Sequence, residues 1–322
     1  MRKLQLILHH TYKNSLKTIL FILKIIIPVT FIVKLLQYLD VLQYITFIFE
    51  PLMGFLGLPG YAALVLVSAN LINIYAGIAI MVTLAFTAKE VTILAVMILF
   101  SHSLIIESSI IKGLKVPIKR QLLLRISASL LSGIILNLMI GNHYNQLTRE
   151  HLKDASAIPN FSIESFWPWL EALLKDYFFS ILGTSLEIII IIVLVLLGLE
   201  ILKQLKIIHY LNRVVYSFTK HLGFSQKSTL SLLVGFFIGI TYGAGTILVE
   251  YKEGNLSQGD VTLVTTFLLL CHSIFEDVIL FVRQGAILWI LLLYKIGYTL
   301  LIVLIYHLLK QRRQRKLVYS QA

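Results

Sequence analysis

The sequence predicts an all-α, polytopic transmembrane helical bundle made of two similar halves. The 322-residue chain is 58% hydrophobic and only 14% charged, whereas soluble domains contain about 25% charged residues. Several apolar runs extend over about 20 residues, the length that crosses a bilayer as a helix. Such runs exclude a transmembrane β-barrel, whose strands alternate over about ten residues. We therefore expect about eight to ten helical spans.

The apolar runs form two series in the same order. They cover residues 18–38, 41–56, 60–83, 91–111 and 122–140 in the first half, and 179–202, 206–222, 229–249, 261–282 and 286–309 in the second. The polar stretch between them carries Trp167 and Trp169, which suit a membrane interface. We therefore expect a first repeat over 1–141, a polar interfacial connection over 142–176, and a second repeat with a basic C-terminal tail over 177–322.

Short motifs recur at nearly one offset. Gly57 pairs with Gly223, Tyr75 with Tyr242, and His102 with His272, at separations of 166, 167 and 170 residues. Three matches in order favour an internal duplication. Five crossings per half make the copies inverted, a plan common in transporters. If the second run of each half lies at the interface instead, eight spans remain and the loop at Lys112 falls on the wrong side of the membrane. Re-entrant geometry could reconcile these observations, and the sequence does not decide between the alternatives.

Positive charge indicates which loops face the cytoplasm. The chain has a formal net charge of +12, and Lys and Arg gather at the N-terminus, over 112–120 and over 310–316. Cytoplasmic loops are enriched in these residues. We therefore expect a multi-pass protein of the cell (inner) membrane with both termini in the cytoplasm. This charge points to membrane lipid, not nucleic acid, as its partner. Cys271 is the only cysteine, so no internal disulfide can form.

The strongest candidate site lies in the run 261–282. On a continuous helix, Thr265, His272 and Glu276 would share one face, flanked by Ser273 and Asp277. Ionisable groups at membrane depth are costly and usually face a cavity, a partner or a pathway. His272 is the most diagnostic of them because imidazole can change charge near neutral pH. The alternative is that the acidic residues lie at a helix end, in water or among headgroups.

The first half carries a shorter version of this site. His102, Ser103 and Glu107 occupy the equivalent run, and Glu107 aligns with Asp277 without gaps. The functional interpretation is a second polar lining for the same solute or coupling ion. The alternative is a histidine that packs between helices, with a glutamate that reaches toward the interface.

Interrupted helices are the second signal. The runs 60–83 and 229–249 each contain Gly or polar residues at which the helix could unwind, and freed backbone groups are tolerated where they line a cavity. Paired interruptions in the two halves indicate a transporter site. The residues concerned are Asn70, Asn73, Tyr75, Tyr242, Gly243 and Gly245. The alternative is that small residues let helices pack closely.

Catalytic and nucleotide-binding motifs are missing. The chain has no GxxxxGK[ST] loop and no HExxH signature. His272 and Glu276 offer only two ligands, too few for a metal site. We therefore expect no enzyme activity, no cofactor and no bound metal.

The segments 57–60, 73–77 and 101–103, with 242–245 and 272–277 in the second half, resemble the nucleoside-recognition or Gate domain. That domain occurs in concentrative nucleoside transporters, in the membrane part of the ferrous-iron transporter B and in the spore maturation proteins A and B. The resemblance implies repeated, often inverted, helical units that move or recognise a small solute, such as a nucleoside or an ion. It also permits a non-transporting membrane scaffold with a membrane partner or a second copy of the chain.

Overall fold

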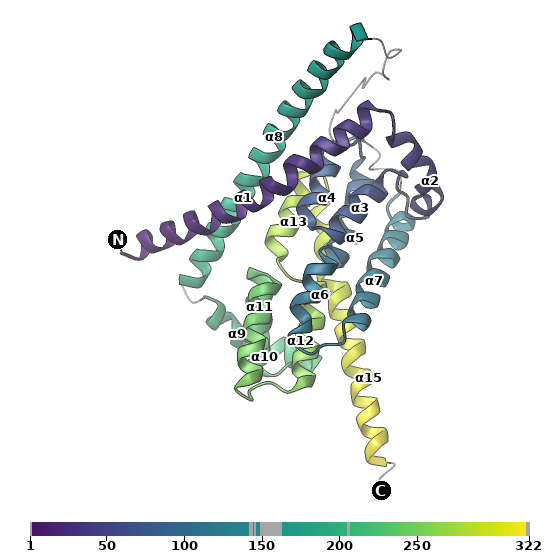
Figure 1. Ribbon diagram of the computed structural model, residues 1–322. Helices are drawn as coiled ribbons and strands as arrows, with labels where there is room; N and C mark the ends of the chain where they lie inside the picture. Colours follow the sequence, from purple (N-terminus) through teal and green to yellow (C-terminus); the bar gives the residue numbers. More distant parts are fainter. Residues whose placement is uncertain (1, 142–143, 145, 149–162, 205–206, 320–322) are drawn as a thin grey trace.

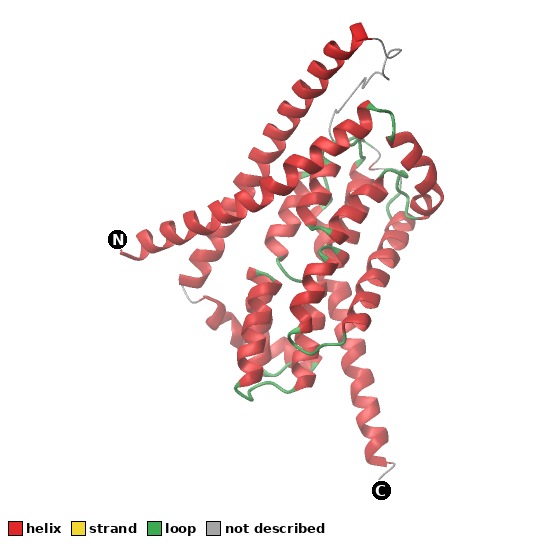
Figure 2. Ribbon diagram, in the orientation of Figure 1, coloured by secondary structure: helices red, strands yellow, loops and turns green. Residues whose placement is uncertain are grey.

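The computed structural model describes residues 2–141, 144, 146–148, 163–204 and 207–319, almost entirely as helices (Figures 1 and 2). The first half contains α1 (Arg2–Tyr38), α2 (Leu42–Phe55), α3 (Ala62–Leu71), α4 (Ile74–Met81), α5 (Ala88–Ser101), α6 (Leu104–Lys112) and α7 (Ile118–Met139). The second half contains α8 (Ile163–Gln204), α9 (Ile207–Thr219), η2 (Lys220–Leu222), α10 (Gln226–Ile238), α11 (Ile240–Lys252), α12 (Gln258–Leu270), α13 (Ile274–Arg283), α14 (Leu288–Leu292), the π-helical η3 (Leu293–Tyr298) and α15 (Thr299–Tyr319). This confirms the helical class.

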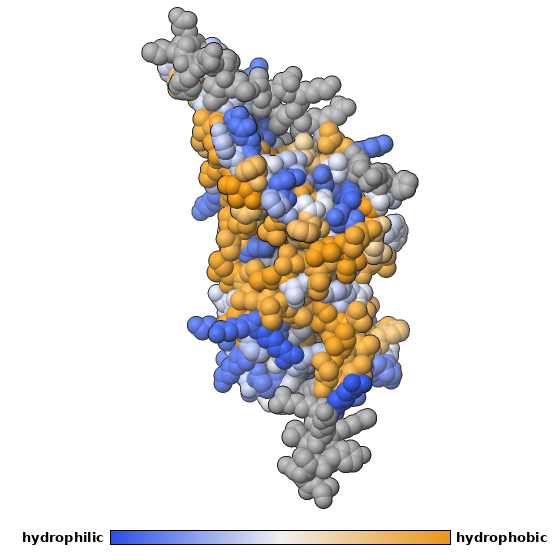
Figure 3. All heavy atoms as spheres, turned by 90° about the vertical axis from the view of Figure 1, so that its right-hand side faces the viewer, coloured by the Kyte–Doolittle hydropathy of each residue, from blue (hydrophilic) through white to orange (hydrophobic). Residues whose placement is uncertain are grey.

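Six stretches of the described chain are long and apolar enough to cross a membrane. They are Thr11–Tyr38, Ala88–Lys112, Ile118–Met139, Phe166–Gly198, Gln258–Arg283 and Leu288–Leu309. Figure 3 shows the apolar side chains gathered in a broad belt, with hydrophilic residues above and below it. A surface that is apolar in a belt and polar at both ends matches a bilayer with water on each side.

Each run expected to form an interrupted crossing helix instead folds back on itself as a hairpin. The hairpin α3–α4 closes where the Tyr61 hydroxyl donates to the Ala85 carbonyl at 2.5 Å. The hairpin α10–α11 closes where Lys227 donates to the Asn255 side chain. Because each hairpin returns to the side where it began, neither adds a crossing. The described chain therefore has six helices long and apolar enough to span a membrane and two hairpins of the re-entrant type, where the sequence predicted eight to ten spans.

The two helices of each hairpin pack closely against each other through small residues. A Cβ added to Gly77 would lie 2.7 Å from the Ala69 Cβ, and one added to Gly243 would lie 2.7 Å from the Gly235 Cα. The expectation that the helix unwinds at Gly243 and Gly245 is therefore wrong, because both lie inside α11. Close packing, the alternative considered for these glycines, explains Gly243.

The breaks themselves lie a few residues earlier. In the first hairpin the turn falls at Ile72 and Asn73, and the Asn73 side chain accepts a hydrogen bond from the Ala76 amide and caps α4. In the second hairpin it falls at Gly239, whose φ of 115° is open to glycine but strained for other residues.

The helices α2 and α9 contain 14 and 13 residues, which span about 20 Å at 1.5 Å per residue. The apolar core of a bilayer is about 30 Å thick, so neither helix crosses it alone. This favours the interfacial alternative for the second run of each half.

The two halves run in opposite directions. In Figure 1 the path from α5 to α6 descends, whereas the path from α12 to α13 ascends. Three crossings per half, an odd number, produce this inversion. The loop after α6 and the C-terminus then lie at the same end of the molecule, as Figure 1 shows. The basic residues of the two segments therefore agree with the positive-inside pattern.

The start of α8 differs from the expected division of the chain. This helix begins at Ile163, so the boundary placed between residues 176 and 177 lies inside a continuous helix, and residues 149–162 lie outside the described part. Helix α8 packs against α1, and Lys34 of α1 forms a 2.7 Å ion pair with Asp176 of α8. The first helix of one half therefore packs directly against the first helix of the other half.

Helices α5 and α12 begin with the same capping box, 170 residues apart. Thr87 accepts from the Glu90 amide while the Glu90 carboxylate accepts from the Thr87 amide. Ser257 and Asp260 repeat the arrangement. The duplication inferred from motifs therefore extends to the first turn of these helices.

We expect Thr87→Ala and Ser257→Ala each to lower the free energy of unfolding by about 1 kcal/mol, the usual loss when an N-cap acceptor is removed. Thermal unfolding of the purified protein in detergent measures this. Thr262→Ala is the control, because Thr262 only donates to the Gln258 carbonyl within α12 and its loss should be close to neutral. Equal effects at all three positions would contradict the capping assignment.

Candidate functional site

The third long run of each half, expected as one continuous helix, is broken at its centre. Helix α5 ends at Ser101 and α6 begins after Ser103, while α12 ends at Leu270 and α13 begins after Ser273. Ser103 and Ser273 have φ of 53° and 47°, a left-handed conformation that is uncommon for serine. Each break puts inside the protein an N-terminal helix end, whose first amides have no partner within the helix.

A cavity of about 310 Å³ lies where the breaks and the hairpin turns meet. It is lined by most of the residues that the sequence singled out: Asn73, Tyr75, His102, Ser103, Glu107, Tyr242, His272, Ser273, Glu276 and Asp277. The two hairpins and the two broken helices surround it, and α1 adds Phe21 to the lining. Residues from both halves therefore share one site.

Four candidate residues do not line this cavity. Asn70 lies in α3 and Thr265 in α12, and Gly243 and Gly245 lie in α11. Thr265 was expected on one helical face with His272 and Glu276. That expectation is wrong because the break before α13 separates Thr265 from the other two.

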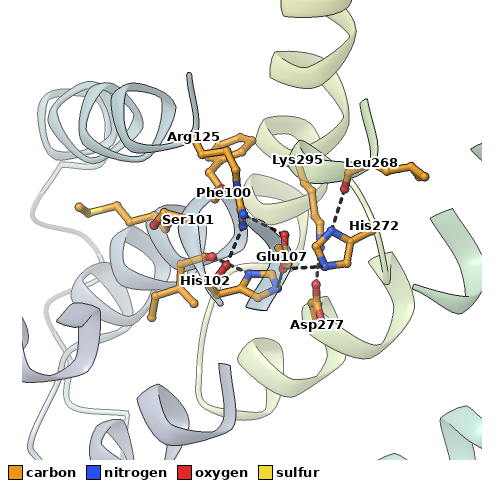
Figure 4. A network of polar contacts seen from close by, with 11 residues as sticks. Phe100, Ser101, His102, Glu107, Arg125, Leu268, His272, Asp277 and Lys295 are labelled. Atoms are coloured by element: carbon orange, nitrogen blue, oxygen red, sulfur yellow. Dashed lines mark hydrogen bonds and ion pairs between the residues drawn. The ribbon is translucent and has the colours of Figure 1, made fainter. Parts of the chain in front are cut away.

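Two ion pairs stand at the centre of the site, one from each half (Figure 4). In the first, Arg125 of α7 contacts the Glu107 carboxylate of α6 at 2.8 Å. Arg125 also donates to the carbonyls of Phe100 and His102, at 2.8 and 2.7 Å. One guanidinium thus caps the end of α5 and pairs with the first turn of α6.

The second ion pair joins Lys295 of η3 to Asp277 of α13, at 2.7 Å. Lys295 is buried, and it lies in a π-helical turn, a distortion often found at functional sites. The two halves share their spacing: His102, Glu107 and Arg125 are 5 and 18 residues apart, as are His272, Asp277 and Lys295.

Sequence reasoning missed both cations. Lys295 is an isolated charge within the apolar run 286–309, a signal that could have drawn attention. Arg125 follows the basic loop 112–120 and resembled its continuation. The shared spacing was visible in the sequence, but the partners lie on different helices, and so helical periodicity alone does not bring them together.

The two histidines face each other between the ion pairs. Their ring centroids are 5.1 Å apart. The Nδ1 of His102 lies 2.9 Å from the Ile98 carbonyl, and the Nδ1 of His272 lies 2.7 Å from the Leu268 carbonyl. Their Nε2 atoms lie 3.4 and 3.5 Å from the same atom, Oε1 of Glu107. Figure 4 shows this convergence on one carboxylate.

A further contact crosses the cavity between a hairpin and a broken helix. The Tyr75 hydroxyl of α4 donates to the Glu276 carboxylate of α13. The equivalent of Glu276 in the first half is Ile106, so the two copies are not equivalent here. Glu276 and Tyr242 also border a second cavity of about 410 Å³, which Lys17 lines from the side of α1.

Comparison with known proteins finds a family and a relative. The family model Gate, described as nucleoside recognition, matches residues 19–117 and 185–287. The chain is 33% identical over 281 residues to the uncharacterized membrane protein YvoD of Bacillus subtilis (strain 168), covering 87% of this chain and 88% of that protein. No solved structure matches the chain. Each stretch matched by the family model contains one re-entrant hairpin and one broken helix.

Proposed function

Because the chain belongs to the Gate family of nucleoside-recognition membrane proteins, we propose that it is a secondary transporter that moves a small polar solute through the central cavity. The observation that carries this proposal is the convergence of two re-entrant hairpins and two broken helices, from inverted halves, on one cavity that holds buried charges. Inverted repeats with discontinuous helices allow alternating access around a fixed site.

The cavity limits the size and chemistry of the solute. Its volume of about 310 Å³ is at the low end of ligand pockets, which measure about 300–1,000 Å³. The helix N-termini offer amide donors, and Glu107, Asp277 and Glu276 offer acceptors. A solute that both donates and accepts hydrogen bonds fits this lining. Nucleosides, which the family description names, are the first class to test.

The orientation supports a cytoplasmic position for the loop after α6 and for the C-terminal tail. Both carry clusters of Lys and Arg and lie at the same end of the molecule (Figure 1). Cysteine introduced at Lys115, after Cys271→Ser, tests this by labelling in intact cells. An impermeant thiol reagent should leave it unlabelled until the cells are opened.

Uptake into proteoliposomes tests transport directly. A panel of labelled nucleosides and small ions would be offered on one side, with protein-free liposomes as background. We expect Glu276→Gln to reduce uptake at least about tenfold, because a hydrogen bond to a charged group contributes about 1.5–3 kcal/mol. The matched control is Glu253→Gln, since Glu253 is exposed at the opposite end of α11 and does not line the cavity.

The scaffold alternative makes the opposite prediction. If the protein only holds a membrane partner or a second copy of itself, no solute of the panel would accumulate. Glu276→Gln would then behave as wild type in cells, and a partner would co-purify after mild solubilisation. That combination of results would contradict transport.

A further inference from the structure

The tautomer of both cavity histidines is set by the backbone. A carbonyl oxygen can only accept a hydrogen bond. The Nδ1 atoms of His102 and His272, next to the Ile98 and Leu268 carbonyls, therefore carry the proton. In a neutral imidazole of this form, Nε2 has a free lone pair. Binding of Nδ1–H to a carbonyl is also how metal-ligating histidines are commonly oriented.

The two lone pairs converge on a carboxylate oxygen without a hydrogen bond. The distances of 3.4 and 3.5 Å from the Nε2 atoms to the Glu107 Oε1 exceed the usual 2.7–3.2 Å of a hydrogen bond that nitrogen makes to oxygen. These distances instead match the spacing between two ligand atoms of one metal ion. Ligands bound at about 2.0–2.1 Å to a tetrahedral metal ion lie about 3.3–3.4 Å apart.

Asp277 completes the set of ligands. One ligand atom from each of His102, His272 and Asp277 lies within 4.8 Å of the others, and all three residues are buried. Lys295 contacts only one Asp277 oxygen, Oδ2, which leaves the other for an ion. The donors therefore come from both halves, and no two of these three ligand atoms are more than 4.8 Å apart.

The charges of the cavity favour a cation at this point. Three carboxyl groups, those of Glu107, Glu276 and Asp277, border the cavity. Among the described residues, the permanent cations that pair with them are Arg125 and Lys295. If all five groups are ionised, the cluster has a net charge of −1. Glu107 and Asp277 are buried. Excess negative charge beside buried groups is costly without a counter-ion, and a bound cation supplies one.

We propose that His102, His272 and the carboxylates of Glu107 and Asp277 bind a divalent first-row transition metal ion in the central cavity. Two imidazole nitrogens with carboxylate oxygens suit such ions, whereas Mg²⁺ and Ca²⁺ prefer ligands that are all oxygen. The inference rests on the proposed function, because it makes the ion the transported solute or its coupling partner. It also departs from the expectation of no metal, which considered only His272 and Glu276.

Zinc binding to the purified full-length protein tests this proposal. Protein in detergent would be treated with a chelator, dialysed and titrated with Zn²⁺ by calorimetry. We expect one ion per chain. His102→Gln and His272→Gln should each weaken binding about 100-fold, since even outer-shell changes cost 10–100-fold. The control is His221→Gln, which removes an exposed histidine outside the cavity.

A second measurement needs no variant and so does not depend on how a variant folds. X-ray absorption of the zinc-loaded wild type should show two nitrogen ligands at about 2.0–2.1 Å. Coordination by oxygen alone would overturn the proposal. So would a failure to bind Zn²⁺, or equal affinity in the wild type and all three variants, since either result would show that the two histidines do not hold a metal ion.

The results also separate this inference from the proposed function. Zinc binding to the two histidines, together with no flux of any solute, would contradict transport and leave the metal site standing. Uptake of a solute by a protein that binds no zinc would overturn the metal site and leave transport standing.

Discussion

Arg125→Met is expected to lower the free energy of unfolding by about 3–5 kcal/mol, the typical cost of removing one partner of a buried ion pair. Methionine has a similar length but cannot donate a hydrogen bond. The Glu107 carboxylate would lose its counter-charge, and the Phe100 and His102 carbonyls would lose the donor that caps α5. Chemical or thermal unfolding in detergent, followed by size-exclusion chromatography, measures the loss.

Two further variants separate the causes. Arg120→Met removes an exposed guanidinium that lies 4.9 Å from the Tyr306 ring centroid, and we expect a loss below about 1 kcal/mol. Glu107→Gln combined with Arg125→Met removes both charges and should be more stable than Arg125→Met alone. If Arg125→Met is as stable as Arg120→Met, the ion pair is not a major contributor to stability.

The Gly239→Ala variant is expected to lose about 3 kcal/mol, the upper end of the cost of a residue held in a strained backbone region. Gly239 has φ 115° and ψ 162°, which alanine adopts only with strain. The added Cβ would also lie 3.0 Å from the Ser273 Oγ. Since the hairpin turn at Gly239 borders the central cavity, solute uptake should fall together with stability.

Gly245→Ala is the matched substitution on the same hairpin. Gly245 lies inside α11, and a Cβ there would have no neighbour within 4 Å. Alanine favours helix over glycine by about 1 kcal/mol, so this variant should be as stable as wild type or more so, with uptake unchanged. A loss of uptake in Gly245→Ala with normal stability would restore the original assignment of this glycine to the site.

Much of the candidate site could be read from residue type and position. Histidine, glutamate and aspartate are energetically unfavourable within apolar membrane-spanning runs and usually have a functional role. This reasoning identified His102, Glu107, His272 and Asp277. It failed for Arg125, whose place next to a basic loop had a simpler explanation. It also failed for Thr265, because a continuous helix was assumed where the chain breaks.

The sequence by itself determined the helical membrane class and the duplication. Both follow from properties that accumulate along the chain: the length of apolar runs and the recurrence of motifs near one offset. Only the tertiary structure decided that the runs 60–83 and 229–249 are hairpins. An apolar run with internal Gly or Asn can cross a membrane or turn back, and the choice depends on contacts such as Gly77 with Ala69.

The tertiary structure also decided which charges meet. The 18 residues from Glu107 to Arg125, and from Asp277 to Lys295, include a change of helix, so their separation along the chain carries no information about distance in space. Packing of α7 against the broken helix α5–α6 sets the first contact, whereas η3 packs against α5 and reaches α13 through the ion pair of Lys295 with Asp277. The sequence supplied the charged groups, and the fold placed them around one cavity.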